Sequence, residues 1–346
     1  MPIAEILGIF LKGFMIANVI MVVFAMMTWA ERRLLSFFQY RLGPNRVGPK
    51  GMLQPIADLL KLIHKENFRP NNVSAVLHLM APIITLFFAL SVFSIIPFGD
   101  ENWNIFGWET APGMAPDLEV GVIFAIALSG LAGYGVIIGG WASNSKFALL
   151  GALRACAQLI SYEVAMTLSV LPIVMMTSSL SLADMATGHL GWSIGGWQPW
   201  FIVWAPLGFV IFFIAALAEA NRAPFDHAEA EQELVGGFHT EFGGLRYAAF
   251  ANAEYLHMIA ISSLGVTFYL GGTSIPFWPD AGPLFDVLAF AVKLAAMLYV
   301  FIWIRATMPR LRYDRLMRFG WKVLLPLATL QMLITALIVS QGWGQI

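Results

Sequence analysis

The chain has 346 residues, of which 59% are hydrophobic and only 12% are charged. A soluble domain carries about 25% charged residues, so this composition, with a mean hydropathy of +0.74, excludes an ordinary soluble enzyme and indicates a polytopic membrane protein. The net charge of −1 gives no reason to expect a nucleic-acid partner, and the single cysteine, Cys156, excludes an internal disulfide.

The apolar residues fall in blocks that are long enough to cross a bilayer, which takes about 20 helical residues. We expect an all-α fold, with a single membrane domain over residues 1–346 that contains about eight membrane-spanning helices. The expected spans are approximately 6–30, 74–97, 118–141, 147–176, 200–219, 245–271, 284–305 and 321–341. The first block lacks a basic n-region and a small-residue cleavage site, so we expect a retained span and not a signal peptide.

Basic residues occur on alternate sides of these spans. All but two of the 20 Lys and Arg residues lie in or beside the first, third, fifth and seventh connections, and the exceptions, Lys12 and Lys293, lie within spans. Under the positive-inside rule these four connections face the cytoplasm, or the matrix of a mitochondrion, and both termini face outward. The alternation also favours an even number of spans, because a missing span would disrupt it.

The first inner connection predicts a short amphipathic helix at about residues 52–65. Glycines and prolines before it indicate an irregular, turn-rich segment. Leu53, Ile56, Leu60 and Ile63 then recur at helical spacing. A helix of about a dozen residues is too short to span, so we expect it to lie in the plane of the membrane interface. There it would form a gate for an apolar substrate or pack on a partner protein.

The connection over residues 219–244 is unusually acidic. It has one arginine, Arg222, and six carboxylates: Glu219, Asp226, Glu229, Glu231, Glu233 and Glu241. Acids at this density raise each other's pKa and titrate as a coupled set. Asp226 followed by Glu229 is typical of the start of a helix, here over about 227–235. The sequence therefore predicts a proton-holding cluster at the membrane edge, with a solvated acidic loop as the alternative.

Charged residues also fall inside the expected spans. Glu163 lies near the middle of the fourth span, Glu254 in the sixth and Lys293 in the seventh, while Glu219 ends the fifth. A charge at mid-membrane costs roughly 2.5–3.5 kcal/mol on insertion scales, so such residues usually face a polar interior and mark an ion or proton path. For Lys293 the alternative is a Lys–Glu pair that fixes two helices together.

Several kinds of chemistry are missing from the sequence. There is no phosphate loop and no dinucleotide fingerprint, because the glycines near 130–135 lie inside an expected span. The six histidines are scattered, and one cysteine argues against a zinc or iron–sulfur site. We expect no metal and no redox cofactor on this chain, so any electron chemistry must come from partners.

Four segments, taken together, resemble a known family. In chain order they read GPNRVGPKGMLQPIADLLK, GWASNSKFALLGALRACAQLISYE, EANRAPFDHAEAEQELVGG and WIRATMPRLRYDRLMRFGWK. They are similar to the H subunit of the proton-pumping NADH–quinone oxidoreductase, which is respiratory complex I. The resemblance covers most of the chain and is weaker in the outer loops.

The resemblance implies a membrane subunit of a translocase of the respiratory chain. In that family the subunit seats the hydrophilic arm, lines the tunnel by which ubiquinone reaches the last iron–sulfur cluster, and starts the chain of membrane carboxylates. It implies ubiquinone as substrate, with FMN and iron–sulfur clusters in partner subunits. The implied partners are the quinone-site and iron–sulfur subunits of the arm, small membrane subunits, antiporter-like subunits and membrane lipid. The implied location is a bacterial inner membrane, with the mitochondrial inner membrane as the less favoured alternative.

Residue roles follow from the resemblance by position. The implied proton relay and coupling residues are Tyr162, Glu163, Glu219, Asp226, Glu229, Glu231, Glu233 and Glu254. We add Lys293 to this set, because its charge lies within the seventh expected span. The implied quinone tunnel and its mouth involve Glu31, Arg32, Arg41, Gln54, Asp58, Arg222 and Phe225. Docking of the hydrophilic arm is implied for Arg305, Arg310 and Arg312.

The chain departs from the family at His227, where the family pattern has an apolar residue. A histidine titrates near neutral pH, so we expect it to perturb the acidic cluster or to pair with Asp226.

Three other readings stay open at the level of sequence. A related subunit of a membrane-bound hydrogenase or formate hydrogenlyase shares the acidic-loop pattern, although the GPNRVG and RATMPRLRYD runs favour complex I. A stand-alone proton-coupled transporter would more often show internal repeats. A structural anchor without a transport role gives no reason for the costly charge of Glu163 at mid-membrane.

Overall fold

The computed structural model describes residues 3–99, 103–105, 108–110, 113–192, 199–228, 235–274 and 282–342. Over these ranges the chain is all-α apart from one short antiparallel hairpin, β1 (Trp103–Ile105) and β2 (Trp108–Thr110), which pairs Asn104 with Glu109. The all-α prediction is therefore confirmed.

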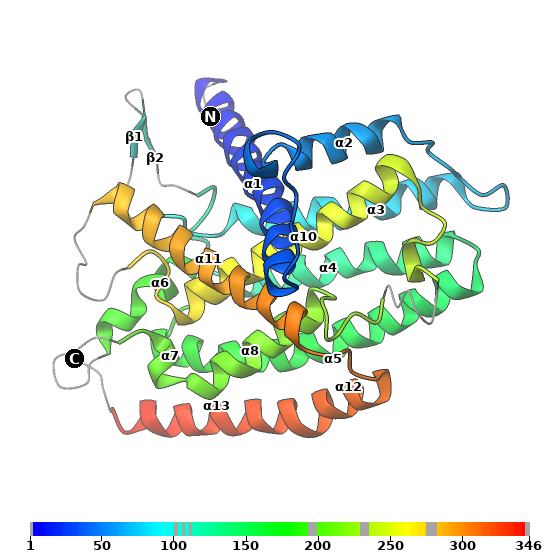
Figure 1. The fold of residues 1–346 in the computed structure, drawn as a ribbon. Coiled ribbons are helices and arrows are strands. Elements are labelled where there is room, and N and C mark those ends of the chain that lie inside the picture. The colour runs from blue at the N-terminus through cyan, green and yellow to red at the C-terminus, as the bar shows by residue number, and fades with distance from the viewer. Residues whose placement is uncertain are drawn as a thin grey trace.

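Long helices form the body of the molecule (Figure 1). They are α1 (Ile3–Phe38), α3 (Ala75–Ser91), α4 (Gly121–Ala142), α5 (Lys146–Thr177), α10 (Gly244–Tyr269), α11 (Pro283–Thr307) and α13 (Leu325–Ser340). The shorter α-helices are α2 (Gln54–His64), α6 (Leu182–Thr187), α7 (Phe201–Trp204), α8 (Pro206–Glu219) and α12 (Tyr313–Phe319). A π-helical turn over Gly320–Leu324 joins α12 to α13, and 3-10 turns occupy Pro49–Gly51, Val92–Ser94, Gly188–Gly191 and Gly237–His239.

Among the described residues, six helical stretches are long and apolar enough to cross a membrane. They are Gly8–Phe38, Ala75–Ser94, Gly121–Ala142, Lys146–Thr177, Pro283–Thr307 and Tyr313–Ser340. The expected span at 200–219 is divided into α7 and α8, because Ala205 leaves the helical conformation immediately before Pro206. The expected span at 245–271 is the continuous helix α10.

Helix α10 owes its lower apolar content to its position in the core. Every residue from Leu256 to Tyr269 is buried, including Ser262, Ser263 and Thr267. A helix surrounded by protein needs no uniform apolar surface, because its polar side chains can bond to carbonyls of the helix itself or of its neighbours. Ser263 and Thr267 both do so, to the carbonyls four residues earlier.

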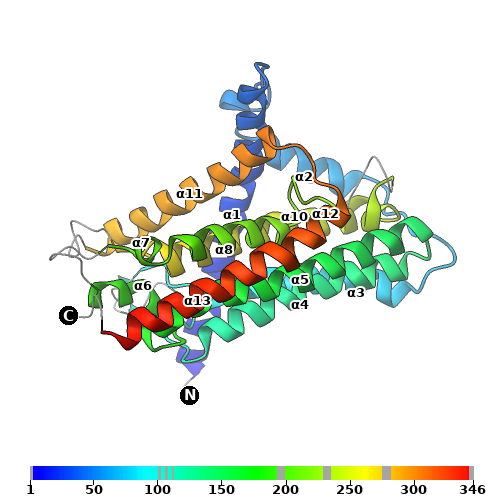
Figure 2. The ribbon, with the colours of Figure 1, turned by 90° about the horizontal axis from the view of Figure 1, so that it is seen from below.

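The bundle is organised around α5, which packs against α4, α8 and α13, while α3 packs against α4 and α10. Figure 2 shows α4, α5 and α13 side by side, with α1 crossing the other helices. Glycines in α4 permit close approach: a Cβ atom at Gly135 would collide with the Thr85 side chain, and one at Gly140 with Ala152.

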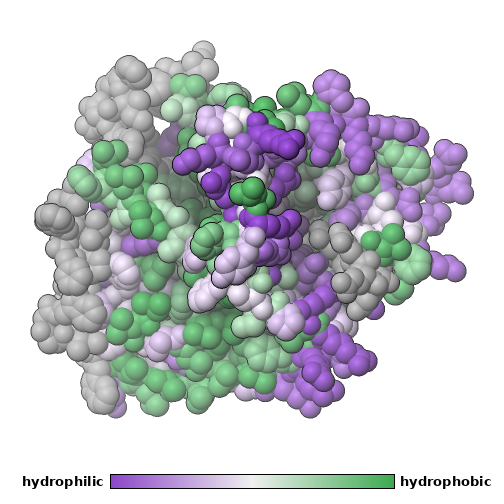
Figure 3. All heavy atoms as spheres, in the orientation of Figure 1, coloured by the Kyte–Doolittle hydropathy of each residue, from purple (hydrophilic) through white to green (hydrophobic). Residues whose placement is uncertain are grey.

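The charged connections gather at one end of the bundle, which we call the basic end. In Figure 1 the loops that join α4 to α5, α8 to α10 and α11 to α12 lie on the right, opposite α6, α7 and the hairpin. Figure 3 shows hydrophilic residues concentrated on the right and in the upper centre. The predicted interfacial helix is present as α2, and its residues Leu53, Ile56, Leu59, Leu60 and Ile63 are all exposed.

Candidate functional site: buried charges at the basic end

A buried charge cluster lies where α1, α8, α10 and α11 meet. Arg222 follows α8 directly, and its Nη1 lies 3.2 Å from Oε1 of Glu31, near the end of α1. Its Nε lies 3.0 Å from Oε1 of Glu254 in α10, and its guanidinium carbon lies 4.1 Å above the ring of Tyr255. Arg305, near the end of α11, also pairs with Glu31. We call Glu31, Arg222, Glu254, Tyr255 and Arg305 the arginine cluster.

The arginine cluster is held in a low-dielectric setting. Glu31 is 3% exposed and Arg222 is 6% exposed. Burial alone lowers the pKa of Arg222, but the carboxylates of Glu254 and Glu31 more than reverse this effect and raise its pKa above the usual value. Arg222 therefore stays cationic, and its charge is the one that both carboxylates share.

A second cluster lies deeper in the bundle. The carboxylate of Glu219, at the end of α8, accepts a hydrogen bond from Ser129 in α4. Its Oε1 lies 3.4 Å from Nε2 of His257, one turn after Glu254 on α10. Glu219 is 3% exposed. We call Ser129, Glu219 and His257 the histidine cluster.

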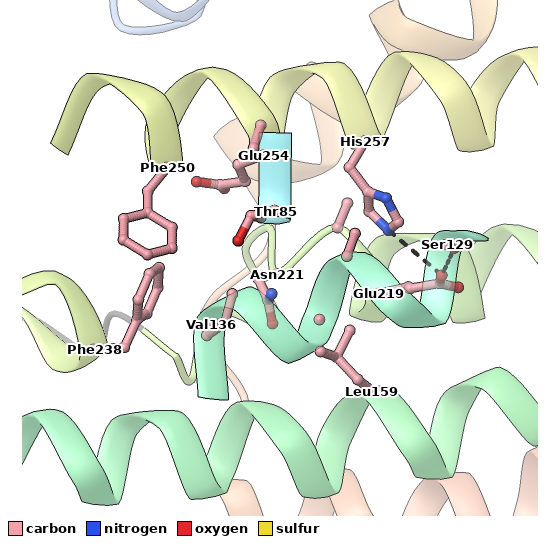
Figure 4. A pocket seen from close by; sticks show the side chains of 14 residues that line it. Thr85, Ser129, Val136, Leu159, Glu219, Asn221, Phe238, Phe250, Glu254 and His257 are labelled. Carbon is pink, nitrogen blue, oxygen red and sulfur yellow. Dashed lines mark hydrogen bonds and ion pairs between the residues drawn. The ribbon is translucent and has the colours of Figure 1, made fainter. Parts of the chain in front are cut away.

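A cavity of about 50 Å³ connects the two clusters (Figure 4). Glu254 and His257 extend into it from α10 and Glu219 lies opposite, while the rings of Phe238 and Phe250 close one end. The other polar lining side chains are Thr85, Ser129 and Asn221. A cavity of this volume with several polar partners can hold ordered water, and Glu254 and Glu219 both line it.

Glu163 lies in an adjoining groove and not in this cavity. The groove has a volume of about 390 Å³ and also exposes Cys156, and it shares Gly133 and Leu159 with the cavity. The Glu163 carboxylate lies against Gly130, where an added Cβ atom would come within 2.7 Å of it. The groove that holds Glu163 and the smaller cavity therefore adjoin each other at Gly133 and Leu159.

Other predicted relay residues lie elsewhere. Tyr162 is fully buried, donates to the carbonyl of Leu316 at 3.0 Å and packs on the ring of Phe225. Lys293 donates to the carbonyls of Leu270, Gly272 and Ser274 at 2.7, 2.9 and 2.7 Å, and its Nζ lies 4.4 Å from the Trp200 ring centroid. Lys293 thus binds the carbonyls that follow the end of α10, which is a structural contact.

The acidic connection is described only in part. Glu229, Glu231 and Glu233 lie outside the described residues, as does most of the helix expected over 227–235. Asp226, which precedes them in the sequence, is half-buried. His227 is 2% exposed and packs edge-on against the ring of Tyr313 at 5.7 Å.

Three of the residues predicted for the tunnel and its mouth, Arg32, Gln54 and Asp58, form a third group on the surface. Arg32 pairs with Asp58, and Gln54 donates to the same carboxylate at 3.1 Å. This contact fixes α2 to the end of α1. Arg41 is exposed, and none of the polar contacts found in the described part of the chain links its side chain to this group.

The three arginines predicted for arm docking differ in their surroundings. Arg305 pairs with Glu31 in the arginine cluster, although 38% of its side chain remains exposed. Arg312 is exposed and its Nε lies 2.8 Å from Asp314. The Nε and Nη2 atoms of Arg310 are buried without a hydrogen-bond partner in the described part of this chain.

Sequence reasoning missed His257 and Ser129 as site residues. His257 lies three residues after Glu254 on one helix, so its position on the same face was available from helical spacing. Ser129 gave no such signal, because its role depends on how closely α4 approaches α8. The described residues contain no group of three or more His, Cys, Asp or Glu side chains placed to hold a metal ion.

Comparison with known proteins places the chain in a family. A family model described as NADH dehydrogenase matches residues 11–336. The chain is 48% identical to the H 1 subunit of the NADH-quinone oxidoreductase of Geobacter metallireducens, over 98% of each chain. It is 44% identical to NADH-quinone oxidoreductase subunit 8 of Thermus thermophilus, over 95% of this chain and 86% of that one. The chain therefore belongs to the NADH dehydrogenase family of membrane subunits, which includes the H subunit of NADH-quinone oxidoreductase.

Proposed function

We propose that this chain lines the quinone tunnel of a proton-translocating NADH–quinone oxidoreductase and starts its carboxylate relay. The observation that carries the proposal is the continuous polar path from the arginine cluster, through the cavity, to the histidine cluster. Charged side chains inside a membrane domain are costly, and they usually mark a path for ions or protons. The names of the relatives supply the reaction, which is electron transfer from NADH to quinone.

Quinone reduction consumes two electrons and two protons to give the quinol. In this proposal the electrons come from FMN and iron–sulfur clusters in partner subunits, while this chain supplies the apolar path and the response to charge. A change in charge near Glu31 alters the balance around Arg222 and so changes the proton affinity of Glu254. Cavity water would then pass the change to Glu219 and His257, which is how a local electrostatic event gains a distant effect.

We place the tunnel mouth at the surface group formed by Arg32, Gln54 and Asp58, where α2 exposes its apolar residues at the basic end. In this proposal residues 1–346 form one membrane domain in a bacterial inner membrane, with the basic end inside and both termini outside. Arg310 and Arg312 would meet the hydrophilic arm.

The proposal is tested on the intact assembly. A tagged chain is extracted in mild detergent and separated on a native gel, and the band is assayed for NADH-driven quinone reduction and for hydrogen evolution. We expect a large complex with quinone reductase activity that tunnel-blocking inhibitors suppress. Hydrogen evolution without quinone reduction would reassign the same residues to a hydrogenase relative. A lone polypeptide with neither activity would reject the proposal and favour a transporter.

A further inference from the structure

Gln158 is a fully buried residue of α5 for which the proposed function has no role. Its side chain is 0% exposed. Its Nε2 donates to the carbonyl of Ala218 at 2.6 Å and to the carbonyl of Phe225 at 2.9 Å. These two carbonyls lie at the start and the end of the turn 218–225, and Arg222 is at the middle of this turn.

The chemistry of the amide determines which way it points. A glutamine amide has two N–H donors, which match the two short contacts, while the contact to Oδ1 of Asn221 is longer, at 3.4 Å. If the amide were turned over, its oxygen would face the carbonyl oxygens of Ala218 and Phe225, and neither carbonyl would receive a hydrogen bond from it. The donors therefore close the turn from the side of α5.

This closure acts on the position of Arg222. Asn221 adopts a left-handed conformation, with φ of 49°, so the chain reverses sharply just before the arginine. The backbone N–H of Arg222 donates to Leu217 at a long 3.3 Å. A turn with a left-handed residue and a long backbone hydrogen bond gains stability from contacts with neighbouring helices. Gln158 of α5 supplies such contacts at both ends of the turn.

We propose that Gln158 is a positioning residue that holds the Arg222 guanidinium between Glu31 and Glu254. It acts through the turn 218–225 and touches neither carboxylate. The inference rests on the proposed function and extends it, because the proposed relay depends on the charge balance that this cation sets between the two carboxylates.

The test compares two buried glutamines in the assembled complex. Gln158→Met keeps the length of the side chain and removes its donors. Gln331→Met is the matched control, because Gln331 is also buried and its side chain donates to Thr335 within the same helix, α13, at 3.3 Å. Two properties are measured for each variant: amide hydrogen exchange of residues 218–228, and the pH profile of NADH-driven quinone reduction with kcat and KM determined separately.

For Gln158→Met we expect exchange in residues 218–228 at least about tenfold faster, because local opening becomes easier. We also expect the pH profile of kcat to change while KM stays the same, because the cation that balances the two carboxylates is displaced. NADH oxidation by a soluble artificial acceptor should stay unchanged. Gln331→Met should resemble the wild type in all of these measurements.

Unchanged exchange together with an unchanged pH profile would overturn the inference. If Gln158→Met reduces the amount of assembled complex, Gln158→Asn gives the same comparison, since it keeps the amide but is one methylene too short to reach both carbonyls. Failure of the proposed function is seen separately, as a wild-type complex that does not reduce quinone. The exchange measurement would still decide whether Gln158 closes the turn.

Discussion

At the scale of single residues, the unusual feature is one arginine shared by two carboxylates, of which Glu31 is buried and Glu254 is half-buried. Arg222 is enclosed by Glu31, Glu254 and the Tyr255 ring, while Arg305 reaches only Glu31. Such a group is weak evidence for stability, since hydrophobic residues can often replace it, but the removal of one partner leaves an uncompensated charge. The arrangement is more easily explained by a task that depends on charge.

The first prediction concerns this shared cation. Arg222→Met keeps the apolar stem but takes the cation away from Glu254 and leaves Glu31 with Arg305 as its remaining partner in the arginine cluster, so it should destabilise the assembled subunit by about 3–5 kcal/mol. Arg312→Met is the control: Arg312 is 81% exposed in its side chain, and the loss of an exposed pair costs about 0–1 kcal/mol. Thermal unfolding of the purified complex measures both. Equal shifts in Tm would contradict the prediction.

The second prediction concerns Glu163. Glu163→Gln should leave assembly intact and reduce proton-coupled turnover at least about tenfold. This reduction is smaller than the loss of about 10²–10⁴-fold that is typical when a positioned proton-transfer group is removed. Glu119→Gln serves as the control, because Glu119 is exposed before α4. Proton uptake and NADH oxidation are measured together in sealed vesicles. Full pumping stoichiometry and rate in Glu163→Gln would remove this residue from the relay.

At the scale of elements, the connections opposite the basic end are anchored by a histidine. His189, in the 3-10 turn Gly188–Gly191, is 1% exposed. It contacts the Ala186 carbonyl at 3.2 Å and the Ser274 hydroxyl at 3.1 Å. Lys293 binds the Ser274 carbonyl, so His189 and Lys293 stabilise the same backbone from two sides.

This anchor should weaken in acid, which is the third prediction. Burial lowers the pKa of His189 to about 4, with a further lowering by the Lys293 cation and an opposing effect of the Ala186 carbonyl. The ordinary pKa is about 6.5, so the folded state prefers the neutral ring. Its stabilising effect is complete above pH 6.5 and is lost as the pH falls toward 4. The loss should amount to about 3 kcal/mol at most.

The measurement is the Tm of the complex against pH for wild type and His189→Gln. The substitution keeps hydrogen-bonding capacity and removes the titration, so its curve should be flatter than that of the wild type between pH 6.5 and 4. Parallel curves would show that His189 does not cause the acid sensitivity.

Some of the helices could be predicted from the sequence, and others depend on contacts that the sequence does not reveal. The apolar blocks predicted the long helices and α2, because length and periodicity are local properties. The division of the fifth expected span at Ala205 depends on one residue before a proline, and the burial of α10 depends on its neighbours. The arginine cluster could not be derived from spacing, because Glu31 and Arg222 are 191 positions apart. The resemblance named the residues but not the contacts among them.

At the scale of the whole molecule, the cavity joins elements that are distant in sequence into one path. Its lining comes from α3, α4, α5, α8 and α10 together with the segment after Gly236. The arginine cluster faces the end of α1 and the histidine cluster faces α4, and Glu254 of the first cluster lines the same cavity as Glu219 and His257 of the second. In the proposed function, water in this cavity carries protons between the two clusters.

The fourth prediction therefore removes the water without changing any carboxylate. Ala132 lines the cavity and is 5% exposed, so Ala132→Val should fill part of the space of about 50 Å³. Adding methyl groups to a packed interior costs about 1–3 kcal/mol wherever it is done. Ala328→Val, at a fully buried site in α13 that is not part of the cavity lining, is the matched control for that cost.

Both variants should assemble, and both should lower the Tm of the complex by similar amounts. Only Ala132→Val should reduce proton uptake per NADH oxidised in sealed vesicles, because it interrupts the water path between Glu254 and Glu219. An equal reduction in both variants would mean that coupling follows general stability. Normal coupling in Ala132→Val, with its added methyl groups shown to occupy the cavity, would require a proton path between the two clusters that bypasses this cavity.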